Sequence, residues 1–489
     1  MRLKILNINI QNKERTVNGI LSILLDVFRQ PAVIVAMISL IGLAVQGKSI
    51  SNIVQGSIRT MVGFLVLAAG SGVVTQALDP FGSMFQYAFH VQGVVPNNEA
   101  IIGTVLLKYG SESALIFFFG MIVNIILSLT SRFKFIYLTG HVAFYMASMI
   151  AVIFNVAGFN TLTLIVIGSL AQGLLITISP ALVQSFMRKA SAKDDVALGH
   201  PASSGVLIGT LVAKLTRSKK HPSKSTEDIK FPSALGFLKD TTVLIALSMA
   251  VIYVVVALFA GPEFIETKLS GGQNFIVFVI LKAAMFSAGV FVILAGVQVV
   301  LDEIVPAFKG ISEKLVKNAK PALDAPMTFG FAPNAVLIGF LASFAGGIVG
   351  MVIMALAGTT VVIPGIVAHF MAGGVTGVFS NGQAGRRGCI IGGFVNGLVI
   401  TFLPLLLLPV LGNIGSANST YSDADYGVAG VIFGYSNVAG GKILLIVAIA
   451  ILYVLFYASS IILTRLENKK VKSLATNNSA SSASDYILD

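Results

Sequence analysis

The chain has 489 residues, of which 55% are hydrophobic and only 11% are charged. Soluble domains carry about 25% charged residues, so this composition excludes an ordinary water-soluble protein and indicates a chain that lies mostly in lipid. The formal net charge is +12, but the basic residues are scattered near the ends of apolar segments and form no stripe for nucleic acid. The single cysteine, Cys389, excludes a disulfide framework and a cysteine-based metal site.

Residues 1–31 form a separate N-terminal segment in our interpretation. The segment opens with basic residues, and its apolar run at 17–28 is broken by Asp26 and followed by Arg29. No small-residue cleavage site follows, so we do not expect a signal peptide. Residues 17–30 suit an amphipathic helix that lies in the membrane interface, and an extra crossing is the alternative.

Apolar stretches recur along the rest of the chain, with the length of about 20 residues that crosses a bilayer. We expect about eleven transmembrane helices, at residues 32–47, 53–77, 114–130, 135–155, 160–187, 240–260, 275–300, 335–356, 359–380, 389–411 and 441–463. They form a first transmembrane repeat at 32–187 and a second at 240–411. An external loop and the last helix occupy 412–464.

Lysine and arginine residues gather in alternate loops, which the positive-inside rule assigns to the cytoplasm. The largest of these is a basic loop at 188–239. The opposite loops carry acids or no charge, and Asp423 and Asp425 belong to one of them. The tail at 465–489 is rich in Ser, Ala and Asn, so we expect it to be cytoplasmic and disordered.

The chain contains an internal duplication. GFLVLAAG at 63–70 returns as GVFVILAG at 289–296, and GHVA at 140–143 returns as GIVA at 365–368, with shifts of 226 and 225 residues. Because each half holds an odd number of spans, the second half should be inverted relative to the first. The predicted fold is an all-α polytopic membrane protein with two inverted five-helix repeats plus one extra helix, an arrangement typical of transporters.

Polar residues inside apolar segments are costly in a bilayer and therefore mark candidate sites. Ser71 lies in Ala69-Gly70-Ser71-Gly72, where small residues could loosen a helix, although helix packing through the glycines is the alternative. Pro96-Asn97-Asn98-Glu99 is mirrored by Pro333-Asn334 in the other half. We expect two re-entrant hairpins whose tips meet near the midplane. Glu99 would accept hydrogen bonds from a sugar there, unless it is an ordinary loop acid.

Three further residues complete the candidate substrate site. His141 begins an apolar span after Gly140, although a single histidine at such a place is often structural. His200 follows Gly199 in the basic loop, and Asp324 lies between two prolines just before the second Pro-Asn tip. The predicted substrate-binding set is Ser71, Asn98, Glu99, His141, His200, Asp324 and Asn334.

Some chemistries are excluded by the motifs that the sequence lacks. It has no GxxxxGK[ST] loop and no HExxH, which argues against P-loop ATP hydrolysis and against a metalloprotease. We expect no catalytic residue, no metal and no cofactor. Amides, small residues and a few carboxylates suit a polyhydroxylated solute that is uncharged or weakly anionic.

Taken together, these blocks resemble the ascorbate-type enzyme IIC, the permease component of the bacterial phosphoenolpyruvate-dependent sugar phosphotransferase system. The similarity extends over nearly the whole chain. It rests on GFLVLAAGSG at 63–72, LTGH at 138–141, Gly199-His200 and GFAPNA at 330–335, together with Pro364-Gly365 and residues 377–379.

The resemblance implies a homodimer in the cytoplasmic membrane, with a V-shaped dimerisation domain and a core domain that moves like an elevator. A separate cytosolic enzyme IIB, with enzyme IIA upstream, would phosphorylate the sugar, so the permease itself would carry no phosphorylated residue. Ser71, His141, His200 and Asp324 match positions that line the family's substrate pocket. No nucleic-acid partner is expected.

Three glutamines of the family are replaced here, by Ala68, Tyr145 and Pro201. The expected substrate is therefore L-ascorbate or a related pentose, pentitol or sugar acid. An ion-coupled secondary transporter of a small polar solute is the alternative, with Glu99 or Asp324 binding a proton or sodium ion. An oligomeric channel is a third option. The basic loop at 188–239, a docking surface for a soluble partner, favours the phosphotransferase permease.

Overall fold

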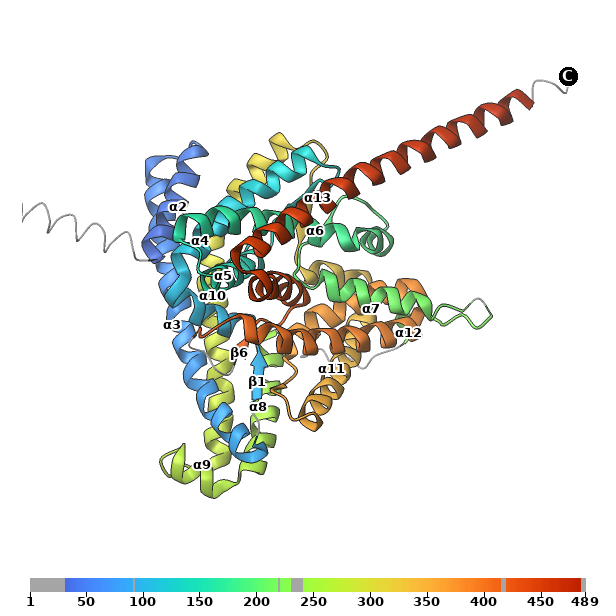
Figure 1. Cartoon of the computed structure of the whole chain (residues 1–489). Helices are drawn as coiled ribbons and strands as arrows, with labels where there is room; N and C mark the ends of the chain where they lie inside the picture. Colours follow the sequence, from blue (N-terminus) through green and yellow to red (C-terminus); the bar gives the residue numbers. More distant parts are fainter. Residues whose placement is uncertain (1–30, 91–92, 219, 230–240, 415–418, 485–489) are drawn as a thin grey trace, which may run out of the picture.

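The computed structural model describes residues 31–484 apart from 91–92, 219, 230–240 and 415–418 (Figure 1). The expected interfacial helix at 17–30 lies outside the described residues. The α-helices are α2 (Pro31–Val45), α3 (Ile50–Phe89), α4 (Asn98–Thr130), α5 (Gly140–Val156), α6 (Thr161–Ser191), α7 (Ser203–Leu215), α8 (Thr241–Ala260), α9 (Pro262–Lys268), α10 (Phe275–Leu315), α11 (Pro333–Leu356), α12 (Ile366–Leu407) and α13 (Ala424–Ser484). The strands are β1 (Gly93–Pro96), β2 (Phe135–Tyr137), β3 (Ala197–Leu198), β4 (Lys320–Leu323), β5 (Val361–Val362) and β6 (Ser419–Thr420). The 3₁₀ helices are η1 (Thr226–Asp228), η3 (Ala325–Phe331) and η4 (Leu408–Val410).

Long apolar helices dominate the fold. Within the described residues, seven helices are long and apolar enough to cross a membrane. The pair α8 and α9, bent by 100° at the break between them, makes an eighth. Helices α5 and α7 are apolar but shorter. The polytopic arrangement is as predicted, with fewer clear spans than the sequence indicates.

Some predicted spans coincide with single helices, and two others share one interrupted helix. The spans expected at 160–187 and 335–356 coincide closely with α6 and α11. The spans expected at 359–380 and 389–411 lie in one helix of 42 residues, α12, which is interrupted where Ala384 and Gly385 leave helical backbone angles. Gly385 has φ +62°, which glycine adopts at little cost, so the chain changes direction there without a loop.

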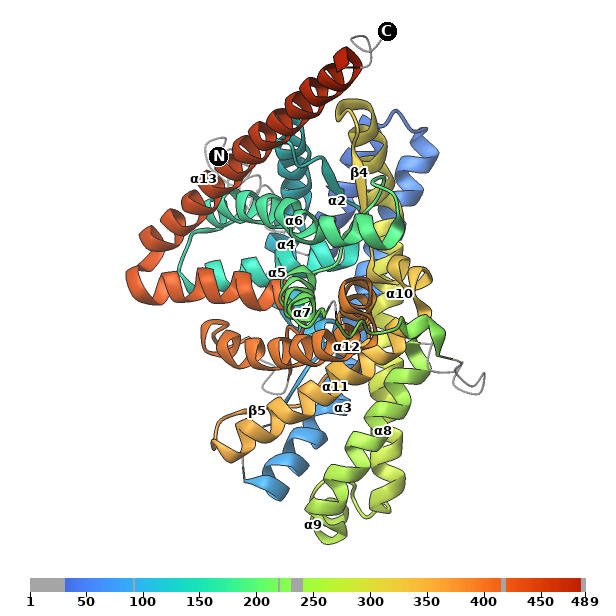
Figure 2. The ribbon, with the colours of Figure 1, turned by 90° about the vertical axis from the view of Figure 1, so that its right-hand side faces the viewer.

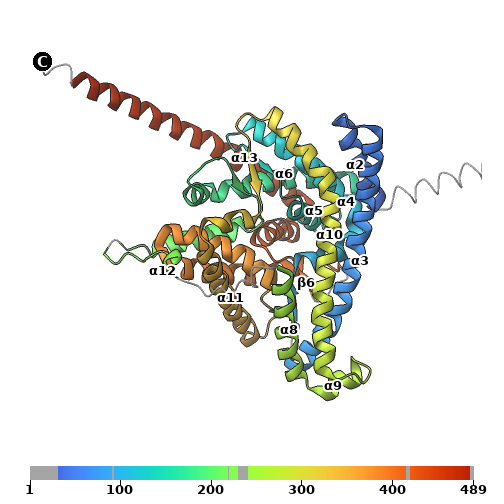
Figure 3. The ribbon, with the colours of Figure 1, turned by 180° about the vertical axis from the view of Figure 1, so that it is seen from behind.

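Helices α3 and α10 run side by side along one edge of the molecule (Figure 3). A Cβ on Gly63 would lie 2.8 Å from the backbone oxygen of Gly296, and one on Gly70 would lie 2.9 Å from that of Gly289. The two copies of the repeated glycine motif therefore pack against each other. Helix α3 continues through residues 69–72, so the expected loosening is wrong and the packing alternative holds.

Two regions expected to be irregular contain regular structure. The segment at 188–239 is not one loop, because it includes β3 and the helix α7, which packs against α12. The tail, expected to be disordered, continues α13 as far as Ser484 and extends away from the rest of the molecule (Figure 2). Leu466, Glu467 and the lysines within 469–472 are good helix formers, which explains why the helix continues past the end of the apolar stretch.

Two small parallel sheets lie among the helices. Their strand orders are β5-β1-β6 and β2-β4-β3. Val94 pairs with Val362 in the first sheet, and Tyr137 pairs with Ala322 in the second. Strands this short give no alternating pattern long enough to detect in the sequence. The predicted all-α class is therefore incomplete.

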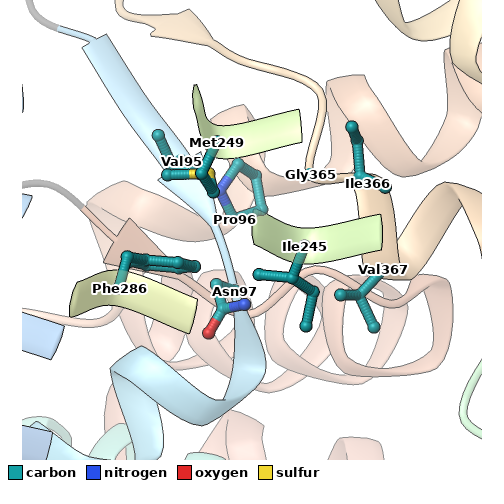
Figure 4. Close-up of a pocket in the computed structure, with 9 residues that line it drawn as sticks. All are labelled: Val95, Pro96, Asn97, Ile245, Met249, Phe286, Gly365, Ile366 and Val367. Carbon is teal, nitrogen blue, oxygen red and sulfur yellow. The ribbon is translucent and has the colours of Figure 1, made fainter. Parts of the chain in front are cut away.

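Helices α2, α3, α8, α9 and α10, which we call the arm, lie on one side of the other elements, which we call the core (Figures 1 and 3). One of the places where the two meet is a small apolar contact (Figure 4); α4 of the core also packs against α2 and α3 of the arm. Ile245 and Met249 of α8 and Phe286 of α10 face residues 95–97 and 365–367 around a cavity of about 20 Å³. The core thus touches the arm here through mostly apolar groups.

Candidate functional site

Strands of both sheets end at one polar cluster. His141 stands in the first turn of α5, after β2, and His200 follows β3. Asp324 follows β4 and caps η3 by accepting a hydrogen bond from the backbone N–H of Ala325. Asp423 follows β6 and precedes α13. Turns between the carboxyl end of a parallel strand and a helix N-terminus are common ligand sites.

Two histidines and two aspartates stand in a line. Nε2 of His141 is 3.5 Å from Oδ2 of Asp324, and Nε2 of His200 is 3.9 Å from Oδ1 of the same aspartate. Nδ1 of His200 is 4.0 Å from Oδ1 of Asp423. Each gap exceeds the normal hydrogen-bond length of about 2.7–3.2 Å. His200 and Asp423 are 7% and 2% exposed, whereas His141 and Asp324 are 28% and 33% exposed, so the line runs from a buried end to an accessible one.

Asn98 and Glu99 join the cluster from the first turn of α4. The amide of Asn98 donates to Oδ2 of Asp423, and its carbonyl oxygen accepts from the backbone N–H of Ser422. Glu99 is buried beside Asn98, close enough for its charge to act on Asp423 and His200. Side chains that follow strands of both sheets therefore meet in this one cluster. Within the described residues, no group of three His, Cys, Asp or Glu is arranged to hold a metal ion.

Several buried polar atoms at the cluster have no hydrogen-bond partner. They are Oγ1 of Thr139, the hydroxyl of Tyr145, Nδ1 of His200, Oγ1 of Thr420 and Oδ1 of Asp423. The Tyr145 ring stands edge-on to His141, with 5.9 Å between ring centroids. Leaving a buried polar group unpaired costs about 1–3 kcal/mol, and such groups are rare in folded proteins. Their concentration here indicates a place that a polar ligand or water fills.

The structure brings five of the predicted site residues together and places two elsewhere. Asn98, Glu99, His141, His200 and Asp324 share the cluster. The amide of Asn334 instead donates to the backbone oxygens of Thr226 and Ile229, so Asn334 holds η1 against the start of α11. The expected meeting of the two Pro-Asn tips is not found among the described contacts. Ser71 lies midway along α3 in the arm, and its side chain is outside what the structure describes.

The predicted position of Asp423 and Asp425 is wrong. The charge pattern assigned them to an external loop, but both are buried in the core. Asp425 accepts hydrogen bonds from Ser179 and Ser204 and so ties α6 and α7 to α13. The signal that could have found Asp423 is its separation from His200, 223 residues, which is close to the shift of the duplication.

An ion pair outside the membrane-spanning helices holds the central strand of the second sheet, β4. Nζ of Lys320, the first residue of β4, lies 2.7 Å from Oδ1 of Asp194, and the amide of Gln184 donates to the same oxygen. Burial raises the pKa of Asp194, but the bonds from Lys320 and Gln184 lower it more, so the net pKa is below the ordinary value. Asp194 is therefore charged at neutral pH and anchors β4 to the end of α6.

The N-terminus of α11 is capped by Glu227 from η1. Its carboxylate accepts hydrogen bonds from the backbone N–H groups of Asn334 and Ala335, at 3.2 and 3.0 Å. We expect Glu227→Ala to destabilise the protein by about 1 kcal/mol, because the first turn of α11 loses an anionic cap. Asp228→Ala, at the neighbouring exposed acid, should change stability little. Thermal unfolding can be followed with a maleimide dye that reacts with the buried Cys389 once it is exposed. Equal midpoints in the two variants would contradict the capping role.

Long apolar helices around a buried polar cluster define a multi-pass protein of the cell membrane. A family model described as the sugar-specific permease component of a phosphotransferase system (PTS) matches residues 26–425. The chain therefore belongs to the family of PTS sugar-specific permease components. It is also similar to the ascorbate-specific PTS system EIIC component of Mycoplasma pneumoniae, with 29% identity over 440 residues. That match covers 76% of this chain and 65% of the relative, so the chain spans just under two thirds of the relative's length.

Proposed function

We propose that the protein is the sugar-translocating permease, enzyme IIC, of a phosphotransferase system, and that it carries L-ascorbate or a related pentose, pentitol or sugar acid across the cell membrane. The open cluster of His141, His200, Asp324 and Asp423 carries this proposal. The two gaps at Asp324, of 3.5 and 3.9 Å, are too long for direct bonds. A substrate hydroxyl can donate to a carboxylate or to an unprotonated imidazole nitrogen and can accept from an imidazole N–H, so a sugar could bond to several of these groups.

We place the substrate among Asn98, Glu99, His141, His200 and Asp324. The unpaired hydroxyl of Tyr145 adds a further donor beside His141. At the position where the family has a glutamine amide, this chain therefore has the phenol of Tyr145. This difference is the reason why the proposal includes a related pentose, pentitol or sugar acid beside L-ascorbate, while family membership and the name of the relative support the substrate class.

The strand arrangement supports an inverted duplication. The order β5-β1-β6 becomes β2-β4-β3 when each strand is exchanged for its counterpart in the other half. Asn98 and Asp324 are 226 residues apart, the same separation as the repeated glycines. Asn98 bonds to Asp423, and its counterpart Asp324 faces His200. The cluster would then consist of two related pairs at the interface of two inverted five-helix halves, with the last helix outside the repeat.

The division into arm and core suits a rigid-body movement. The contact between them in Figure 4 is mostly apolar, and apolar surfaces can slide without breaking directional bonds. We propose that the core carries the substrate in an elevator-like step, while the arm stays fixed against a second copy of the chain in a homodimer.

A separate enzyme IIB, with enzyme IIA upstream, would phosphorylate the sugar. A basic strap, formed by residues 216–218 and 220–229, supports this partner. The guanidinium of Arg386 donates to the backbone oxygen of Ser225, and that of Arg387 donates to the backbone oxygen of His221. These bonds hold the strap at the interruption of α12, where it presents a cationic surface to a soluble partner that carries a phosphoryl group.

Uptake of radiolabelled L-ascorbate by cells that express the chain tests the proposal. The label should accumulate as a phosphate ester, removal of the soluble phosphoryl donors should stop accumulation, and ionophores should have little effect. The alternative is an ion-coupled secondary transporter, which the burial of Glu99 favours. It predicts the reverse: sensitivity to ionophores and accumulation of the unmodified sugar. Flux without accumulation would indicate a channel.

A further inference from the structure

We propose that Asp423 is a positioning residue that fixes the ring orientation and tautomer of His200. Nδ1 of His200 and Oδ1 of Asp423 are both buried without a partner, and they stand 4.0 Å apart. A ring nitrogen that can donate and a carboxylate oxygen that can accept thus face each other across a slightly open gap. A shift of about 1 Å would close it to a hydrogen bond and satisfy both atoms at once.

Asp423 is held so that this oxygen stays available. Its other oxygen, Oδ2, accepts from the amide of Asn98 and from the hydroxyl of Ser422. Asn98 is fixed in turn by the backbone N–H of Ser422. Because these contacts come from α4 and from the turn before α13, the carboxylate has a defined orientation before any ligand arrives.

The pairing decides which nitrogen of His200 carries the proton. A carboxylate only accepts hydrogen bonds, so Asp423 favours the tautomer with the proton on Nδ1. Nε2 then carries the lone pair and faces Oδ1 of Asp324 at 3.9 Å. Two acceptors cannot bond to each other, but each can accept a hydrogen bond from a different substrate hydroxyl. Nε2 of His200 would therefore accept a hydrogen bond from a substrate hydroxyl, an inference that rests on the proposed function.

Asp425 offers a matched control in the same segment. It is also buried, but both of its oxygens are occupied: Oδ1 accepts from the N–H and hydroxyl of Ser204, and Oδ2 accepts from the hydroxyl of Ser179. Its role is to join helices. The same change, aspartate to asparagine, at the two positions separates an effect on His200 from a general effect of losing a buried carboxylate.

Asp423→Asn keeps the shape of the side chain and reverses its bonding toward His200. The asparagine carbonyl would remain on Asn98, so its NH₂ group would face Nδ1, which must then accept, and the proton moves to Nε2. ¹⁵N NMR of the purified full chain with labelled histidine can read the tautomer, with His200→Gln assigning the signal among five histidines. We expect Nδ1–H in the native protein and in Asp425→Asn, and Nε2–H in Asp423→Asn. The same tautomer in the native protein and Asp423→Asn would overturn the proposal.

Binding of radiolabelled L-ascorbate to the same samples tests the consequence for the substrate. Asp423→Asn should weaken binding by about tenfold or more, as expected for a lost hydrogen bond to a polar group in a buried site, and Asp425→Asn should bind normally once folded. If Asp425→Asn yields no folded protein, the tautomer of His200 in Asp423→Asn decides the role of Asp423 by itself. Absence of binding in the native protein would reject L-ascorbate as substrate, while the tautomer result still decides the role of Asp423. Normal affinity with a changed tautomer would reject the link to the substrate.

Discussion

Asp324→Asn is expected to weaken substrate binding by about ten- to a hundredfold, the loss that follows when hydrogen bonds to a charged group are removed. The carboxylate is shared, with His141 nearest Oδ2 and His200 nearest Oδ1. The asparagine side chain has one oxygen that accepts hydrogen bonds, whereas its NH₂ group can only donate them. The amide oxygen can still cap Ala325, so the fold should survive. Binding of radiolabelled L-ascorbate to purified protein, measured beside its thermal unfolding, separates the two effects.

His141→Ala tests the same contact from the other side. We expect a similar loss of affinity, and a double variant with Asp324→Asn that loses little more than the worse single variant, because side chains that act through one contact are not additive. Asp79→Asn, on the exposed surface of α3, should bind like the native protein. Normal affinity in Asp324→Asn, or fully additive losses, would remove this pair from the binding site.

The long helices could be predicted because apolar stretches of bilayer length are a strong local signal. The two sheets could not, because their strands have two to four residues and pair across the two halves of the chain. Gly93 pairs with Val361, and Phe135 pairs with Lys320, at separations that no local pattern encodes. These pairings decide where each strand ends, and so they decide which polar residues meet.

The same reasoning explains which site residues could be found. His141 and Asp324 stand out because they are polar groups beside glycine or proline in apolar surroundings. Asp423 does not stand out in the sequence, because the polar stretch around it has the composition of an external loop. It is buried because β6, which ends just before it, pairs with β1. Asn334 was misplaced for a related reason: a Pro-Asn sequence marks a helix start, but it does not say which segment that helix start faces.

Gly397→Ala in α12 is expected to prevent stable folding of the core. A Cβ at this position would lie 1.9 Å from the backbone oxygen of Ser343 in α11, so no side-chain rotation could relieve the clash and the two helices would have to separate. Overpacking of a buried contact costs about 1–3 kcal/mol and sometimes more. The Ser343 hydroxyl also hydrogen bonds with Nδ1 of His369 and donates to Asn396, and separation would strain these buried bonds. We expect a large loss of monodisperse protein and a lowered thermal midpoint.

Gly382→Ala is the matched control on the same helix. No atom lies within 4 Å of a Cβ at Gly382, and alanine favours a helix over glycine by about 1 kcal/mol, so this variant should be as stable as the native protein or slightly more stable. Equal behaviour of the two variants would mean that α11 and α12 cross more loosely than the structure has them. A loose crossing would also undermine the elevator-like movement, because a core that shifts as one body needs its helices locked to each other more firmly than to the arm.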